Sequence, residues 1–260
     1  MDILFNKRCF RIDRISLPVV TTLAIMMVFT VSCKRENLDD CYTNTGEVTT
    51  ETRQATYFKK IELYDNVNLV IEPGDGHFLR VEAGKNILSS IKTEIVDSVL
   101  VITNTMKCNW VRNYNHEMTV YVSSNNLNSI RYEGSGDITT AGTYEFDSLE
   151  INAWGGAGSV NMDVKCNRID LGLHYGTVDF NVTGTSQMTT IYSNSYGPFH
   201  CGGLKSDIVY LHSNSTNDCY VNAKYILGAE ITSVGNIYYS GDPYELNCNI
   251  SGSGKLIKID

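Results

Sequence analysis

Three histidines in the second half of the chain are the residues best suited to acid–base chemistry, because an imidazole titrates near neutral pH. They are His174, His200 and His212. A glycine or asparagine recurs about every 20 residues here, and the histidines lie two before, three after and five before their local marker. Because these phases differ, we expect the histidines to be isolated on strands or at the surface, without forming a column or a general-base constellation.

Two aspartates have the chemistry for glycoside hydrolysis, which needs two carboxyl groups roughly 5–10 Å apart. Asp163 follows its glycine marker by five residues and Asp179 by three, so neighbouring repeats can bring them together without requiring it. An enzyme acting on acidic polysaccharides also needs a basic cleft, but the basic residues of the central repeats are scattered in phase: Lys165, Arg168, Lys205 and Lys224. We therefore expect solvated acids and a non-catalytic protein, with a polysaccharide lyase or hydrolase as the alternative.

Asp137 is the best candidate for a metal ligand. Its run Gly134-Ser135-Gly136-Asp137 approaches the Gly-Gly-x-Gly-x-Asp repeat of calcium-binding β-rolls, but Val160 stands where the next repeat needs an aspartate. Calcium takes six to eight oxygen ligands, which one carboxylate among neutral neighbours does not supply. Cysteine and histidine pairs at zinc-binding spacing are missing from the sequence as well. We interpret Asp137 as a surface-turn residue and expect no metal and no cofactor.

Tyrosine is the one residue type whose abundance hints at a binding surface. Aromatic side chains can stack on sugars or anchor a protein partner. We nevertheless expect half or more of the repeat tyrosines to pack in the interior or against loops. They are Tyr175, Tyr192, Tyr196, Tyr210, Tyr220, Tyr225, Tyr238, Tyr239 and Tyr244.

The elements that position these side chains follow from an internal repeat. Its markers are 22, 18, 21, 20, 18 and 19 residues apart: Gly136, Gly158, Gly176, Gly197, Asn217, Gly235 and Gly254. Asparagine tolerates positive φ better than other non-glycine residues, which accounts for Asn217. Alternating apolar stretches flank the markers, and so small a sheet-forming unit must stack on its neighbours to bury them. We predict an all-β fold, a right-handed single-stranded parallel β-helix or solenoid of about 20 residues per rung, with a β-sandwich as the alternative.

The first half of the chain also has the pattern of short strands. Residues 47–54 are polar without an apolar period, so we interpret them as linker, and order begins near Tyr57. Residues 95–102 are a strand pair around Asp97-Ser98, and residues 87–91 are either one helical turn or a loop. We therefore predict one β-helix domain at 55–256, with N-terminal strands over 55–125 and regular glycine-marked rungs over 126–260.

The N-terminus has the features of an export signal. Four basic residues precede an apolar run at 15–31, which threonines and Pro18 make unsuitable for a transmembrane helix. The run ends in Thr30-Val31-Ser32-Cys33, which resembles the lipobox of bacterial lipoproteins, where cleavage precedes a cysteine that is then diacylated. We expect a signal peptide at 1–32, lipidation of Cys33 and a polar tether at 33–54, which anchor the protein to the outer membrane on its surface or periplasmic face. An ordinary signal peptide with an incidental cysteine is the alternative.

Charge and cysteine content restrict the partners and the compartment. Loss of the signal moves the formal charge from −8 to about −10, which argues against binding nucleic acid or adsorbing broadly to anionic membranes. The six remaining cysteines allow 15 pairings in an exported chain, and we expect some to be buried thiols. They are Cys41, Cys108, Cys166, Cys201, Cys219 and Cys248.

The order of several segments resembles the GIN-domain family, the head domains assigned to auto-transporter adhesins. The resemblance spans about 57–256 and rests on residues 58–63, 67–75, 100–102, 119–122, 127–130 and 133–138. It implies a β-helical fold in an exported lipoprotein, without catalytic residues that can be carried over. It therefore favours an adhesin or binding module for a glycan or protein ligand, with an envelope structural protein as a further alternative.

Overall fold

The computed structural model describes residues 44–74, 76–106 and 117–259. The chain divides into two compact units, Met1–Tyr42 and Thr43–Asp260, and the second carries the fold presented here. The expected signal peptide, Cys33, Cys41 and Cys108 lie outside the described residues. In the described part, no helix is long and apolar enough to cross a membrane.

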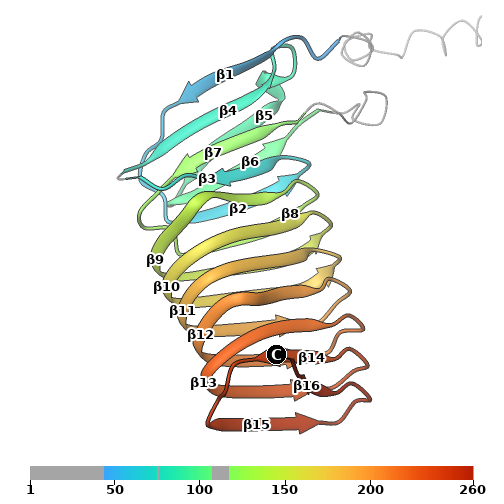
Figure 1. Ribbon diagram of the computed structural model, residues 1–260. Coiled ribbons are helices and arrows are strands. Elements are labelled where there is room, and N and C mark those ends of the chain that lie inside the picture. The colour runs from blue at the N-terminus through green and yellow to red at the C-terminus, as the bar shows by residue number, and fades with distance from the viewer. Residues whose placement is uncertain (1–43, 75, 107–116, 260) are drawn as a thin grey trace, which may run out of the picture. The chain divides into compact units, whose positions relative to one another are not determined.

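The second unit is a stack of parallel β rungs, which confirms the predicted solenoid (Figure 1). Five long strands form its regular part, and successive registers are offset by about 20 residues, as in Ser159 beside Asp179. The strands are β9 (Ile138–Gly156), β10 (Ser159–Gly176), β11 (Asp179–Ser193), β12 (Phe199–Ser213) and β13 (Cys219–Ile231).

Each long strand bends midway and so contributes to two sides of the solenoid. The bend is clear in β13, whose first half pairs with β14 (Ile237–Ser240) and whose second half pairs with β15 (Glu245–Ile250). We call the side built by the first halves side A and the side built by the second halves side B. On side A the last strand is β16 (Leu256–Lys258), which pairs with β14.

The core lies between the two sides because alternate residues of every strand point inward. On side A, Phe180 and Phe199 are neighbours in the register and stack with their ring centroids 4.6 Å apart. On side B, Leu171 and Ile191 hold the same inward positions and are also buried. The apolar alternation in the sequence is thus the pattern of residues that the solenoid removes from water.

The glycine markers form a column where one rung packs on the next. A Cβ atom added at Gly136, Gly158 or Gly197 would collide with a carbonyl oxygen of the preceding rung, so the close approach of the backbones at these three positions depends on glycine. The register, however, pairs Gly176 with Gly156 and places Val178 beside Gly158, so Gly176 is not a member of the column. The column reads 136, 158, 178, 197, 217, 235 and 254, which is more regular than the predicted spacing.

The explanation predicted for Asn217 was wrong. Asn217 is not among the residues with positive φ, and among the column's glycines none has positive φ either. Instead, the Asn217 side-chain amide donates a hydrogen bond to the carbonyl of Tyr196 in the preceding rung. The column is therefore selected by contact between rungs and not by backbone conformation.

The N-terminal end departs from simple succession of rungs. Strand β2 lies between β6 and β8, and β3 lies between β7 and β9, so the first rung in sequence is second in space. Antiparallel strands β4 and β5 extend the two sides at this end. The elements are β1 (Val48–Arg53), β2 (Lys60–Asp65), β3 (Asn68–Ile71), β4 (Phe78–Gly84), the 3₁₀ turn η2 (Leu88–Ser90), β5 (Ile91–Val96), β6 (Val99–Asn104), β7 (Thr119–Ser123) and β8 (Ser129–Gly134).

Two local predictions for this region had different outcomes. The hairpin around Asp97-Ser98 is confirmed, since both residues have positive φ in the turn between β5 and β6. The linker expected at 47–54 was wrong, because β1 pairs along its whole length with β4. An edge strand needs no apolar periodicity, and the Arg53 guanidinium adds hydrogen bonds to the carbonyls of Ile91 and Leu88.

Candidate functional site

A column of aromatic rings runs along the outer surface of side B. The rings of Trp154 and His174 stack with centroids 3.7 Å apart, His174 lies 5.2 Å from Tyr192, and Tyr192 stacks on His212 at 5.4 Å. The expectation that the histidines would not line up was therefore wrong for His174 and His212. The expectation failed because the position of His174 was counted from Gly176, which is not in the glycine column. The position of His212 was counted from Asn217, which is in the column, so the two counts were not comparable.

A missing side chain allows His174 to join this column. Asn152, Gly172, Tyr192 and His212 are successive neighbours in the register, and His174 follows Gly172 by two residues. A Cβ atom at Gly172 would lie 3.2 Å from Nε2 of His174, so the imidazole uses space that another residue would fill. The same Nε2 lies 2.9 Å from Oδ1 of Asn152, which fixes the ring over the glycine.

His200 joins a second column, on side A. Its ring stacks on Tyr220 with centroids 5.5 Å apart, and Tyr220 stacks on Tyr238 at 4.9 Å. His200, Tyr220 and Tyr238 are direct neighbours in the register of three strands. None of the three predicted histidines is therefore isolated.

The two histidines of the side B column each lie close to charged side chains. Partial burial lowers the pKa of His174, nearby Glu150 opposes this shift, and Arg131 adds to it. At the other end, Nδ1 of His212 lies 2.8 Å from Oε2 of Glu230. Neighbouring stacked rings present mainly their edges to water, so most of the column stabilises the solenoid surface and leaves few ring faces free.

The repeat tyrosines are more accessible than expected. None of the nine is buried: six are exposed, and Tyr220, Tyr238 and Tyr239 are half-buried. Tyr210 is 45% exposed, and its ring has no aromatic partner among the described residues. We expected half or more to pack in the interior or against loops. None of the nine packs in the interior, because the inward positions are taken mainly by aliphatic residues and phenylalanines.

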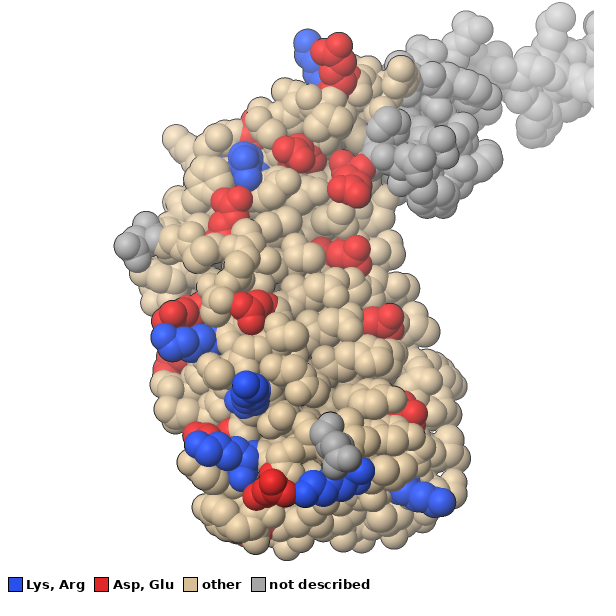
Figure 2. Space-filling model, in the orientation of Figure 1, with Lys and Arg blue, Asp and Glu red and all other residues tan. Residues whose placement is uncertain are grey.

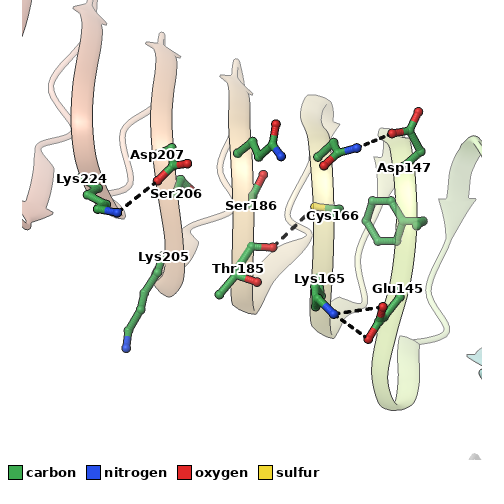
Figure 3. Close-up of a pocket in the computed structure, with 13 residues that line it drawn as sticks. Glu145, Asp147, Lys165, Cys166, Thr185, Ser186, Lys205, Ser206, Asp207 and Lys224 are labelled. Carbon is green, nitrogen blue, oxygen red and sulfur yellow. Dashed lines mark hydrogen bonds and ion pairs between the residues drawn. The ribbon is translucent and has the colours of Figure 1, made fainter.

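Charged and polar residues line a groove of about 890 Å³ where the strands bend (Figure 3). Lys165 and Lys205 share one row of the register with Thr185 between them, and Lys224 lines the same groove. The lysines were expected to be scattered in phase, and this was wrong for Lys165 and Lys205. Lys224 lies outside their row, because the register places Asn222 beside Lys205. Arg168 lies apart from them and pairs with Asp170 at 2.8 Å.

We call this groove the bend groove, and most of the charged side chains that line it are already paired. Lys165 lies 3.1 Å from Glu145, and Lys224 lies 3.9 Å from Asp207. Lys205 has no acidic partner among the described residues, and in Figure 3 its side chain extends away from the other labelled charges. Exposed pairs of this kind contribute little to stability, so they leave the groove polar but weak as an electrostatic anchor.

The predicted carboxylates are held apart. Asp163 accepts hydrogen bonds from the hydroxyl groups of Thr143 and Thr183, whereas Asp179 lies beside Ser159 at the start of β11. The register places Asp163 beside Thr183, four residues from Asp179, which corresponds to about 13 Å along a strand. The sequence allowed them to pair, but the register does not bring them together.

Asp137 lies at a turn, as expected, and links two rungs. Its Oδ1 accepts hydrogen bonds from the backbone amide and the hydroxyl group of Ser159, at 2.9 and 2.7 Å. The corresponding residues Asp218 and Asn236 accept the amides of the next rungs in the same way. Among the described residues there is no group of three or more histidine, cysteine, aspartate or glutamate side chains placed to hold a metal.

The described cysteines are free thiols. Cys166, Cys201 and Cys219 are buried, which confirms that some of the cysteines pack in the core, and Cys248 is exposed. Burial raises the pKa of Cys201 to about 12 and that of Cys219 to about 11. The three buried thiols therefore act as small apolar side chains.

A second groove lies on side B at the end of the aromatic column and includes its last two rings, Tyr192 and His212. It is an open groove of about 750 Å³, and two adjacent outward rows of the register supply its aromatic rings and most of its polar groups. One row contains Thr190, Tyr210, Gly228 and Asn247, and the other contains Tyr192, His212, Glu230 and Asn249. We call it the Tyr210 groove.

Comparison with known proteins places this geometry in a family. The family described as "Putative auto-transporter adhesin, head GIN domain" matches residues 57–243. Among solved structures, one described as a "putative adhesin" from Bacteroides fragilis is 25% identical, with a TM-score of 0.75, over 82% of this chain and 97% of that chain. No curated protein matches the sequence.

Two further structures share the fold at lower identity. A "putative lipid binding protein" from Parabacteroides distasonis is 20% identical with a TM-score of 0.60, over 83% of this chain and 98% of that chain. A "putative adhesin" from Parabacteroides merdae is 17% identical with a TM-score of 0.58, over 83% and 97%. With the family match over most of the described solenoid, the chain belongs to the GIN-domain family.

Proposed function

We propose that this protein is a lipid-anchored adhesin of the cell envelope, which binds its ligand through side chains on the outer surface of the solenoid. The observation that carries the proposal is the set of exposed rings and amides in register on side B, ending in the Tyr210 groove. Membership of an adhesin-like family and the similarity to the Bacteroides fragilis structure support a binding role at the cell exterior.

The solenoid suits such a role because its surface is rigid and periodic. Neighbouring strands are about 4.8 Å apart, so every outward row presents side chains at a fixed spacing along the axis. On the surface shown in Figure 2, charged side chains are sparse and most of the area is uncharged. A surface of this kind favours recognition by stacking and hydrogen bonding over long-range electrostatic attraction.

We propose that the protein is not an enzyme. In support of this, Asp163 is engaged by two threonines, and Asp179 lies four register positions away from it. Of the described residues that line the Tyr210 groove, Glu230 is the one with a carboxylate. Glycoside hydrolysis with two carboxyl groups finds no such pair at either place.

The anchor rests on the sequence. The apolar run and Thr30-Val31-Ser32-Cys33 support cleavage after residue 32 and acylation of Cys33, with the solenoid on the surface or periplasmic face of the outer membrane. Metabolic labelling of the full chain with an alkyne fatty acid should label the wild type and the matched control Cys41→Ser, but not Cys33→Ser. Labelling that survives Cys33→Ser would refute the anchor.

Adhesion can be tested separately on whole cells. Cells that display the full chain should adhere to mucin- or matrix-coated surfaces more than cells with the empty vector, and soluble purified chain should compete. Equal adhesion by both strains on every coating would contradict the adhesin function. The result does not depend on which ligand class the Tyr210 groove accepts.

A further inference from the structure

We propose that the Tyr210 groove is a binding site for a neutral saccharide. This inference rests on the proposed adhesin function and specifies the chemical class of its ligand. The volume of about 750 Å³ is in the range of small-molecule sites and suits a mono- or disaccharide. The groove combines an apolar platform, hydrogen-bonding groups around it and a lining that contains a carboxylate.

The apolar platform is the ring of Tyr210, which lies over Gly228, a residue without a side chain. A Cβ atom added at Gly228 would lie 2.6 Å from Cδ1 and 3.0 Å from Cε1 of Tyr210. The ring therefore crosses the hollow between two rungs, while 45% of the residue stays exposed. Unlike Tyr192, which stacks on His212, Tyr210 has no ring partner among the described residues, so its π surface is available to the C–H face of a sugar.

Hydrogen-bonding groups surround this ring on the neighbouring rung and in the adjacent row. Nδ1 of His212 holds Oε2 of Glu230 at 2.8 Å, which orients the carboxylate and leaves its second oxygen as an acceptor. Asn247 donates to Glu245 at 2.9 Å, which leaves its carbonyl oxygen free to accept. The side-chain amide of Asn249 has no hydrogen-bond partner among the described residues. Vicinal hydroxyl groups of a sugar need such a mixture of acceptors and donors.

The lining charge decides between neutral and acidic sugars. Among the residues that the structure describes, Glu230 is the one carboxylate of the groove and no lysine or arginine lines it, whereas three lysines line the bend groove. A uronate or sialate would bring a second negative charge beside Glu230 without a cation to offset it. The neutral hexoses and N-acetylhexosamines are therefore the class that fits.

The site can be tested with the purified full chain in detergent on an array of neutral disaccharides (lactose, maltose and chitobiose) and acidic ones (digalacturonate and sialyllactose). We expect binding to at least one neutral sugar and none to the acidic sugars. Tyr210→Ala should weaken that binding about tenfold or more, and Gly228→Ala should also weaken it by displacing the ring. The matched control Tyr196→Ala removes another exposed tyrosine, outside the groove, and should leave binding unchanged.

Three outcomes would overturn the inference. Absence of binding to every neutral sugar, or preference for the acidic ones, refutes the ligand class, and neutral-sugar binding that survives Tyr210→Ala refutes the site. Circular dichroism of each variant separates loss of the site from loss of the fold. If cells adhere but no sugar on the array binds, the adhesin function is supported and the saccharide site is refuted. If cells fail to adhere and the arrays are blank, both fall.

A charge variant gives an independent readout. Glu230→Gln keeps a hydrogen-bonding side chain but removes the negative charge, so binding of the acidic disaccharides should rise relative to the wild type. No change in the ratio of acidic to neutral binding would show that Glu230 does not select the ligand charge, and would contradict the proposed recognition.

Discussion

The indole ring of Trp154 and the imidazole ring of His174 lie face to face, with centroids 3.7 Å apart and planes 6° from parallel. This contact partly removes His174 from water, and partial burial is the main cause that lowers its pKa below 6.5. The stack thus connects the packing of two rungs to the lowered pKa of His174.

We predict that His174 makes the protein less stable as the pH falls. Because the pKa is lower in the folded chain, the unfolded chain binds more protons once the pH drops below about 6.5, and stability decreases through that window. Imidazole titration by NMR should place His174 below 6.5, and Trp154→Ala should move the value upward by exposing the ring. A His174 pKa that is insensitive to Trp154→Ala would contradict the role of the stack.

The glycine column predicts a large difference between two glycine substitutions. Gly136→Ala places a Cβ atom against the carbonyl oxygen of Val67, and overpacking of this kind costs about 1–3 kcal/mol of unfolding free energy. Gly202→Ala is the matched control, because its nearest neighbour is Cβ of Tyr220 at 3.8 Å, and it should change stability by about 0.5 kcal/mol or less. Urea unfolding of both variants measures the difference, and equal midpoints would refute the steric explanation.

Tyr132 predicts alkaline destabilisation. Its buried hydroxyl group donates to the carbonyl of Gly136 at 2.5 Å and accepts the amide of Gly158 at 3.1 Å. Burial raises the pKa of Tyr132, and likewise of Tyr144, to about 12 from the ordinary 10. The raised pKa favours the neutral folded form, so this stability is complete below pH 10 and is lost as the pH rises towards 12.

Urea midpoints measured from pH 8 upward, together with tyrosinate absorbance, check this loss. Tyr132→Phe should lower stability near neutral pH by about 1–3 kcal/mol, because the buried carbonyl of Gly136 and the partly buried amide of Gly158 lose their partner. It should also reduce the alkaline decrease, to which Tyr144 still contributes. Tyrosinate formation by all tyrosines at ordinary pH values in the folded chain would contradict the prediction.

The cysteines predict selective labelling. Cys248 is exposed and should react with maleimide in the native protein, whereas Cys166, Cys201 and Cys219 are buried and should react only in denaturant. Burial also raises the pKa of each buried thiol, which keeps the reactive thiolate scarce. Peptide mapping after labelling identifies each site, with Cys248→Ser as the control. Native labelling of Cys201 would show that the rung opens there.

Local patterns in the sequence were enough to predict the solenoid. The alternation around Phe180 and Leu171 marks inward positions, and a rung of about 20 residues follows from the repeated glycines. The hairpin at Asp97-Ser98 could likewise be predicted from the residues of its turn. Each of these features depends on a few residues close together in the sequence. They can therefore be predicted without knowing the register between rungs.

The candidate binding surface depends on the register between rungs, which is known only once the chain has folded. His174 reaches Tyr192 because Gly172 leaves a space, and Tyr210 reaches across Gly228 for the same reason. A shift of two residues between Gly176 and Val178 changes which side chains become neighbours, and a pattern search cannot detect it. The repeat and the core could be predicted from the sequence alone, because the alternation of buried and exposed residues is visible within each strand. The contacts between rungs determined the rings, charges and grooves on the outside.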